Sequence, residues 1–394
     1  MDAREGLAEL AVVVGANVQP GQLVRVSADV VHAELVRAVA DAAYRHGASY
    51  VEADFSDLRL RRSQVRHARG EVRGVLPAWW EAGLQQLADA GGARIMIYAP
   101  TAPGLFDDLD PARVSRAQPP RSSTWRAVEY VVNNTVIPGP NDAWASAIHP
   151  DLPQDEALSK LWRQIALACR LDQPDPAAAW RVRFAELRRR AETLTALGLN
   201  TVRLVGPGTD LRVGLLETAR WDPPTNVNVH GIEHAWNLPS EEVYTVPDPE
   251  RADGHVRLTR PAVVGERLVE DVELTFAAGR LTGVAGGDGI DTLREFIARD
   301  PGMSRLGELA LVDGESAVGS VGQTFGMILL DENVAAHIAL GFGFPELVDP
   351  SMRDRVNDSG DHLDVTVGSD EVAVVGHDRD GREHALIDGG CWQL

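Results

Sequence analysis

Three side chains late in the sequence have the types and spacing of metal ligands. His362 and Asp364 stand two positions apart in the alternating segment HLDVTVGS, so on a strand both project from the same face and could bind one ion. Glu308 interrupts the apolar run LGELALV, where burying a carboxylate without a partner is costly. Taken singly, an H-x-D pair more often belongs to a surface strand, and Glu308 could lie on an edge strand with its carboxylate in water.

Two further segments contribute a histidine and a pair of acids. His337 lies in DENVAAHIALG, where the pattern predicts a helix over 332–340 that ends at Gly341. Glu241 and Glu242 open the strand-like stretch EEVYTV, and only one of them can face a site because neighbours on a strand alternate. Two glutamates, two histidines and one aspartate are ligands that suit two clustered Zn, Co or Mn ions.

The composition excludes several other classes of protein. The 394 residues carry 38 Lys and Arg against 58 Asp and Glu, a net charge of −20, which disfavours nucleic acids and anionic membrane surfaces as partners. Cys169 and Cys391 are far apart and form no C-x-x-C pair, which is typical of a reducing compartment. The first residues lack the apolar core of a secretory signal, and no apolar run approaches the ~18 residues of a membrane span. We expect a cytoplasmic location.

The elements that must position these residues divide the chain. In the first part, strands are predicted over 23–27, 50–55 and 93–98 and helices over 33–45 and 84–90, which indicates an α/β domain with a parallel sheet. Short strands with glycine turns dominate after residue 200, which indicates a mixed α+β domain. We expect an N-terminal domain over 1–110, a helical connection over 111–199 that is partly joined to it, and a metal-binding catalytic domain over 200–394.

Five ordered segments resemble the M29 family of metal-dependent aminopeptidases. They are GPGTDLRVGL, WNLPSEEVYTVPD, RLGELALV, LLDENVAAHIALG and NDSGDHLDVTVGSDEV. The resemblance implies an N-terminal α/β domain, a C-terminal domain with a two-metal site, and a homodimer with enclosed active sites. Carried over residue by residue, it implies metal ligation by Glu242, Glu308, His337, His362 and Asp364. Glu308 is then the expected bridging and catalytic carboxylate, while the general base stays unassigned, with Glu241 conceivable only if it turns inward.

One position departs from the family pattern. Family members usually have a tyrosine where this chain has Phe344, and a phenyl ring cannot donate a hydrogen bond to a developing oxyanion. Losing such a donor typically costs about 10² to 10³ in rate. Phe344 and Trp236, which is close in sequence to Glu242, are the expected pocket residues.

The sequence supports one leading function and two alternatives. The leading hypothesis is an aminopeptidase in which two divalent ions share a water and act on small peptides. His337, His362 and Asp364 alone would match a mononuclear iron(II) site, so the first alternative is a ring-cleaving dioxygenase of the 2,5-dihydroxypyridine type acting on another small molecule. The second is a metal-binding pseudoenzyme marked by Phe344. The i, i+4 pair His230 and His234 is not expected to form another metal site.

Overall fold

The computed structural model describes residues 2–70, 74–117, 128, 130–264 and 267–394. They form two compact units, the first made of Met1–Val182 and Thr225–Ser240 and the second of Arg183–Pro224 and Glu241–Leu394. The chain passes from the first unit to the second within helix α9 (Pro176–Ala196). The expected boundaries at residues 110 and 199 stay a prediction.

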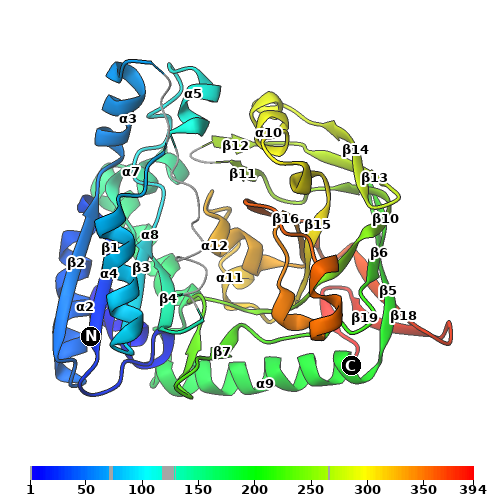
Figure 1. The fold of residues 1–394 in the computed structure, drawn as a ribbon, viewed down its shortest axis with the longest axis horizontal. Helices are drawn as coiled ribbons and strands as arrows, with labels where there is room; N and C mark the ends of the chain where they lie inside the picture. Colours follow the sequence, from blue (N-terminus) through cyan, green and yellow to red (C-terminus); the bar gives the residue numbers. More distant parts are fainter. Residues whose placement is uncertain (1, 71–73, 118–127, 129, 265–266) are drawn as a thin grey trace. The chain divides into compact units, whose positions relative to one another are not determined.

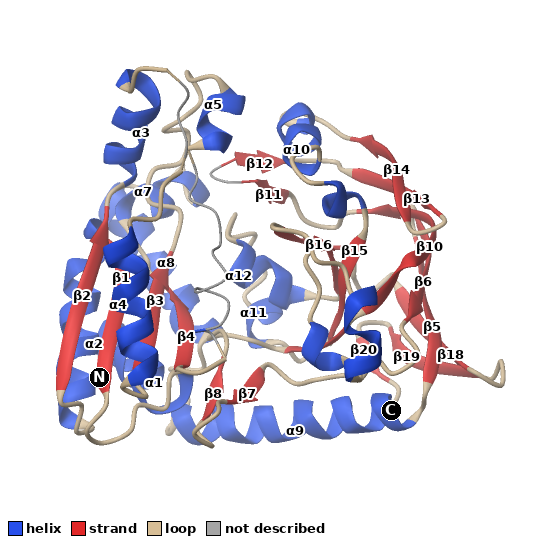
Figure 2. Ribbon diagram, viewed as in Figure 1, coloured by secondary structure: helices blue, strands red, loops and turns tan. Residues whose placement is uncertain are grey.

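The first unit is built on a parallel four-stranded sheet in the order β2-β1-β3-β4. Its strands are β1 (Leu23–Asp29), β2 (Tyr50–Ser56), β3 (Ala93–Tyr98) and β4 (Asn133–Pro138). Its helices are α1 (Ala3–Leu10), α2 (Ala33–Arg45), α3 (Leu58–His67), α4 (Ala78–Asp89), α5 (Pro111–Arg116), α7 (Asp142–Ile148) and α8 (Gln154–Ala168). Helices α2 and α4 both contact β1 (Figure 2). The predicted parallel sheet is confirmed.

The signals in the first unit agree with its structure. Helix α2 covers the predicted range 33–45, and Gly47 just beyond it has a φ of +89°, the left-handed conformation that ends many helices. Strand β4 and helix α7 escaped the sequence prediction. A short hairpin of β7 (Thr225–Val227) and β8 (Glu233–Ala235) also belongs to this unit.

The second unit holds two antiparallel sheets. The larger has the order β14-β13-β10-β6-β5-β18-β19-β20. Its strands are β5 (Leu199–Gly206), β6 (Thr209–Leu215), β10 (Pro247–Arg257), β13 (Glu273–Ala277), β14 (Arg280–Ala285), β18 (Ala373–Asp378), β19 (Glu383–Asp388) and β20 (Cys391–Trp392). Beside these sheets lie the pair β11 (Ala262–Val264) and β12 (Arg267–Val269) and the helices α10 (Ile290–Ile297), α11 (Ala317–Ser320) and α12 (Ile328–Asp331).

The smaller sheet, with the order β17-β16-β15-β9, carries the predicted ligands. Its strands are β9 (Glu242–Thr245), β15 (Leu306–Val312), β16 (His337–Gly341) and β17 (His362–Thr366), and β15 and β16 run side by side (Figure 1). Each residue of β15 and of β16 is buried, so this sheet forms the centre of the second unit.

The helix predicted over 332–340 is wrong. Only a short 3₁₀ turn, Glu332–Val334, follows α12, and Ala335 is already extended, with φ −158° and ψ 176°. His337 therefore lies on strand β16. A short, fully buried apolar run has the same pattern in a helix and in a central strand, and here pairing with β15 and β17 decides for the strand.

Candidate metal centre

The register of the smaller sheet brings the five predicted ligands to one face. Ala339 pairs with Glu308 on one side and with Asp364 on the other, so both acids flank the same position of β16. His337 lies two residues before Ala339, and His362 lies two residues before Asp364, so both project from that face as well. Glu242 is placed on the remaining strand by its pairing with Val312 of β15, which lies four residues after Glu308.

The ligand atoms lie close together in two groups. His337 Nε2 is 3.0 Å from Glu242 Oε2. His362 Nε2 is 3.1 Å from Glu308 Oε2 and 3.0 Å from Asp364 Oδ1. Two triads result, each with ligand atoms within 4.8 Å of one another: Glu242, Glu308 and His337, and then Glu308, His362 and Asp364. Glu308 belongs to both.

Burial and mutual charge shift the titration of the cluster. Burial, and then the charges of Asp364 and Glu242, raise the pKa of Glu308 to about 7 against the opposing effect of His362. Burial by itself would lower the pKa of His337, but the hydrogen bond and charge of Glu242 together with the charges of Glu308 and Asp364 raise that pKa to about 10. Without cations, the cluster therefore gathers protons to offset its negative charge.

The residues fit divalent cations by charge and by geometry. Three buried carboxylates and a partly buried one lie close to two imidazoles in this part of the described chain: Glu242, Glu308 and Glu332, then Asp364, against His337 and His362. Buried carboxylates need compensating charge, and two divalent cations would supply four positive charges to four negative ones. Nδ1 of His362 donates to the carbonyl oxygen of Phe342 at 2.7 Å, which leaves Nε2 with its lone pair toward the cluster, as in most metal-binding histidines.

Comparisons with known proteins agree with this geometry. The family model for thermophilic metalloprotease (M29) matches residues 2–392. This chain belongs to the M29 family. Aminopeptidase T of Thermus thermophilus is 36% identical over 399 residues, which cover 98% of each chain, and Aminopeptidase 2 of Geobacillus stearothermophilus is 33% identical over 98% of this chain and 96% of its own. The solved structure of wild-type AmpT from Thermus thermophilus matches with a TM-score of 0.90 and 34% identity, covering 100% of this chain and 99% of that one.

M29 membership makes this protein a metal-dependent aminopeptidase, a hydrolytic exopeptidase. The aminopeptidase function of the leading hypothesis is thereby confirmed, and so is the fold that the resemblance implied. The number and the identity of the metal ions stay a prediction. The relatives named here are aminopeptidases, and the comparisons support neither the iron dioxygenase nor the pseudoenzyme.

Glu332 is a buried acid of the M29 site that the sequence prediction missed. Burial, and then the negative charges of Asp364 and Glu242, raise its pKa well above the ordinary value. Among the described side chains it belongs to neither triad. Glu332 lies five residues before His337, in a 3₁₀ turn that precedes strand β16. The strand pattern around His337 therefore gave no sign that Glu332 would lie beside the ligands.

Glu241 does not serve the site in the way considered from the sequence. It is 0% exposed, and its Oε2 accepts a hydrogen bond from Arg183 Nε at 2.6 Å. Its carboxylate is thus neither in water nor beside Glu308, because β9 turns successive side chains to opposite faces. The structure therefore removes Glu241 as a candidate general base.

The two expected pocket residues differ in what surrounds them. The ring of Phe344 lies edge-on to His362, with centroids 5.8 Å apart, and to Tyr244 at 5.1 Å, so it borders the triads. Trp236 belongs to the first unit, where its ring contacts Tyr130 and His234. A pocket role for Trp236 stays a prediction. His234 is a buried neutral side chain whose Nδ1 donates to the Asn134 carbonyl at 2.8 Å.

Proposed function

We propose that the five clustered side chains hold two divalent cations and that this aminopeptidase removes N-terminal residues from small peptides. The observation that carries the proposal is the membership of Glu308 in both triads. Glu308 would therefore help to hold both cations, because its carboxylate is the one side chain that the two triads have in common. Glu242 and His337 complete one ligand set, and His362 and Asp364 complete the other.

The donor types favour Zn, Co or Mn. Carboxylate oxygens and imidazole nitrogens without a thiolate are common ligands for these ions at hydrolytic sites. When bound, such a pair lowers the pKa of a water, polarises the scissile carbonyl and offers a binding point for a free α-amino group. Binding of the free α-amino group would explain why only the N-terminal residue is removed.

We assign proton transfer to Glu332. Its carboxyl is buried beside the ligands without belonging to a triad, which suits a group that exchanges protons rather than one that holds a cation. Glu332 would take a proton from the attacking water and return it to the amine that leaves when the peptide bond breaks.

Phe344 gives this site an apolar border. Its ring contacts His362 and Tyr244 and offers no hydrogen-bond donor. The ring therefore cannot help to stabilise the developing oxyanion, so we expect a lower turnover than a phenol at this position would allow.

A homodimer and a cytoplasmic location complete the proposal. The homodimer is an extension of the family resemblance. The cytoplasmic location rests on the cysteine pattern and the acidic composition. Within the described part of the chain, no helix has the length and apolar character needed to cross a membrane.

The test combines metal content with turnover. The purified protein is stripped with a chelator and reloaded with Zn²⁺, Co²⁺ or Mn²⁺, and each form is assayed on a panel of amino-acid p-nitroanilides. We expect about two ions per chain and cleavage that returns when metal is added back. In Glu308→Gln we expect both ions to bind more weakly. One ion per chain, or cleavage that survives complete removal of metal, would contradict the proposal.

A further inference from the structure

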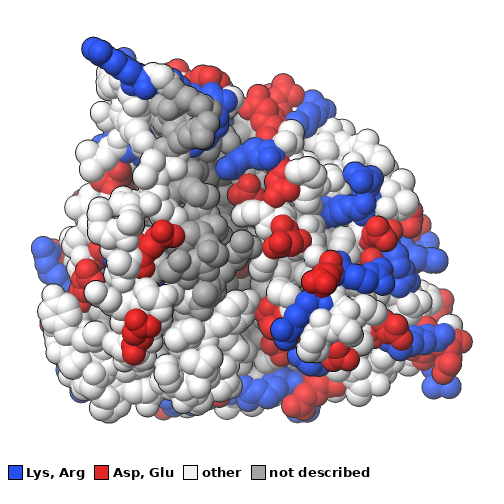
Figure 3. Space-filling view, in the orientation of Figure 1, with Lys and Arg blue, Asp and Glu red and all other residues white. Residues whose placement is uncertain are grey.

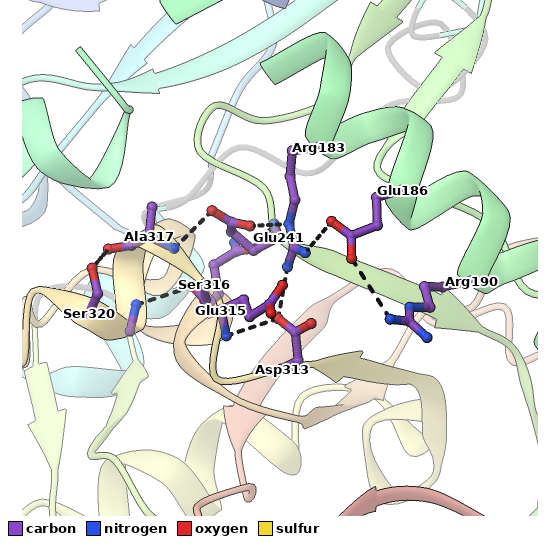
Figure 4. A network of polar contacts seen from close by, with 11 residues as sticks. Arg183, Glu186, Arg190, Glu241, Asp313, Glu315, Ser316, Ala317 and Ser320 are labelled. Carbon is purple, nitrogen blue, oxygen red and sulfur yellow. Dashed lines mark hydrogen bonds and ion pairs between the residues drawn. The ribbon is translucent and has the colours of Figure 1, made fainter. Parts of the chain in front are cut away.

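A buried arginine lies behind the candidate metal centre. Arg183, on α9, is 5% exposed, and its guanidinium contacts three carboxylates (Figure 4). Nε donates to Glu241 Oε2 at 2.6 Å, Nη2 to Asp313 Oδ1 at 2.8 Å, and Nη1 to Glu186 Oε2 at 3.1 Å. Glu241 and Asp313 are themselves buried, at 0% and 2% exposed. Arg183 thus supplies the positive charge that two buried acids need.

Those two acids lie beside the ends of β9 and β15, the strands that carry Glu242 and Glu308. Glu242 pairs with Val312 in the β9–β15 ladder, so Glu241 and Asp313 come next on the two strands, one step beyond that pair. The guanidinium of Arg183 bonds both acids and so connects β9 and β15 next to the position of Glu242. Without the arginine, two buried like charges would face each other at this point and push the strand ends apart.

The same network reaches the turn before the third ligand strand. The second oxygen of Glu241 accepts from the Ala317 amide at 3.0 Å, and the Glu241 amide donates to Asn333 Oδ1 at 2.6 Å. Asn333 lies in the turn that leads into β16 and His337. The hydroxyl of Ser316 donates to the Asn333 carbonyl at 2.5 Å and holds the turn from the other side. Contacts through Glu241 therefore link the positions of Glu242 and His337.

We propose that Arg183 is a positioning residue for one of the two cation sites, the one formed by Glu242, Glu308 and His337. This inference rests on the two-cation function proposed above. The other triad shares only Glu308 with this one, and its His362 and Asp364 lie on β17, at the opposite edge of the sheet from β9. Loss of Arg183 therefore weakens one site and spares the other.

Two titrations of the metal-free protein measure the ion affinity of each site. Co²⁺ binding is followed by its absorption spectrum and Zn²⁺ binding by calorimetry. We expect Arg183→Met to bind one ion with wild-type affinity and the other about 10- to 100-fold more weakly, the range for residues that orient metal ligands. Arg183→Lys keeps the positive charge, but an ammonium group cannot bond both acids as the planar guanidinium does. The ion affinity of its weaker site should therefore lie between that of Arg183→Met and that of the wild type. Should Arg183→Met fail to fold by circular dichroism, Arg183→Lys carries the test.

Arg190→Met is the matched control. Arg190 lies on the same helix and, within the described part of the chain, contacts Glu186 at 3.8 Å, the Leu394 carbonyl oxygen and the ring of Trp392, but neither Glu241 nor Asp313. We expect this variant to bind both ions as the wild type does. Equal weakening of both sites in Arg183→Met, unchanged binding at both, or the same loss in Arg190→Met would overturn the inference. If the wild type itself bound fewer than two ions, the two-cation proposal would fail and this inference with it, so the wild-type titration separates the two failures.

Discussion

At the scale of single residues, the candidate site depends on which side chains are buried and what opposes their charge. Glu308 and Glu332 are both buried acids beside other acids, yet only Glu308 lies within a triad. Phe344 borders the same cluster with an apolar ring. These differences underlie the separate roles that we propose for Glu308 as a ligand, Glu332 as a proton carrier and Phe344 as a pocket wall, and a substitution can test each role.

Glu332→Gln should separate catalysis from metal binding. The amide keeps the size of the side chain but cannot accept a proton from water, so we expect kcat to fall by about 10² to 10⁴ while two ions stay bound. Metal analysis and steady-state kinetics on the same sample check this. Glu295→Gln, at an exposed position of α10, is the control and should leave both quantities unchanged. Loss of an ion in Glu332→Gln would make Glu332 a ligand instead.

Phe344→Tyr should raise turnover. A phenol placed against His362 can donate a hydrogen bond toward the cluster, and we expect kcat to rise about tenfold or more with little change in KM. Phe342→Tyr is the matched control, because the Phe342 ring contacts the Phe344 ring at 5.8 Å, whereas the hydrogen bond between Phe342 and His362 uses only the Phe342 backbone carbonyl. Unchanged or lower kcat in Phe344→Tyr would show that the site operates without such a donor.

At the scale of elements, the four-stranded sheet decides where the ligands lie. The register of β15 against β16 shifts between Leu306 and Glu308, and Gly307 stands at that irregularity. A Cβ at Gly307 would come within 2.2 Å of the carbonyl oxygens of Gly341 and Phe342. Only glycine permits this close approach, and the approach sets the position of the bridging candidate that follows.

Gly307→Ala should therefore disturb both the sheet and the metal centre. Backbone atoms must shift to admit the methyl group, so we expect a loss of about 1 to 3 kcal/mol in unfolding free energy together with weaker binding of both ions, since Glu308 serves both triads. Urea unfolding and Zn²⁺ calorimetry measure the two effects. Gly287→Ala, where a Cβ would meet its nearest neighbour at 3.4 Å, is the control. Wild-type metal affinity in Gly307→Ala would contradict the role given to this irregularity.

At the scale of the whole molecule, acidic and basic side chains are mixed on the face that Figure 3 shows, while two titratable histidines are buried. On the face of Figure 3, acidic and basic side chains of the second unit are interspersed, so the net charge of −20 is not gathered there in one patch. Inside the first unit, His32 and His234 are 3% and 1% exposed. Burial lowers the pKa of each to about 4, against an ordinary value near 6.5.

These two histidines predict acid sensitivity. Below pH 6.5 the unfolded chain takes up protons that the folded chain refuses until about pH 4, so stability is lost as the pH falls through this window. A shift of this size is worth up to roughly 3 kcal/mol for each group. The free energy of unfolding, measured with urea at several pH values from 7 to 4, should fall less steeply with decreasing pH in His234→Gln than in the wild type. An identical slope would place the acid sensitivity elsewhere.

The sequence by itself determined the parallel sheet, the ligand types and the family. Alternation of strand and helix, and ligands carried in ordered segments, depend on local pattern, and local pattern is readable before folding. It could not determine that His337 lies on a strand, since a buried run of five residues fits either element until its neighbours pair with it. The strand pattern alone could not say which of Glu241 and Glu242 faces the site, although the family resemblance implied Glu242, and the sequence did not reveal Arg183 or Glu332. Their roles arise where α9, β9, β15 and the turn before β16 meet, and only tertiary contacts bring residues so distant in the chain to one buried cluster of charge.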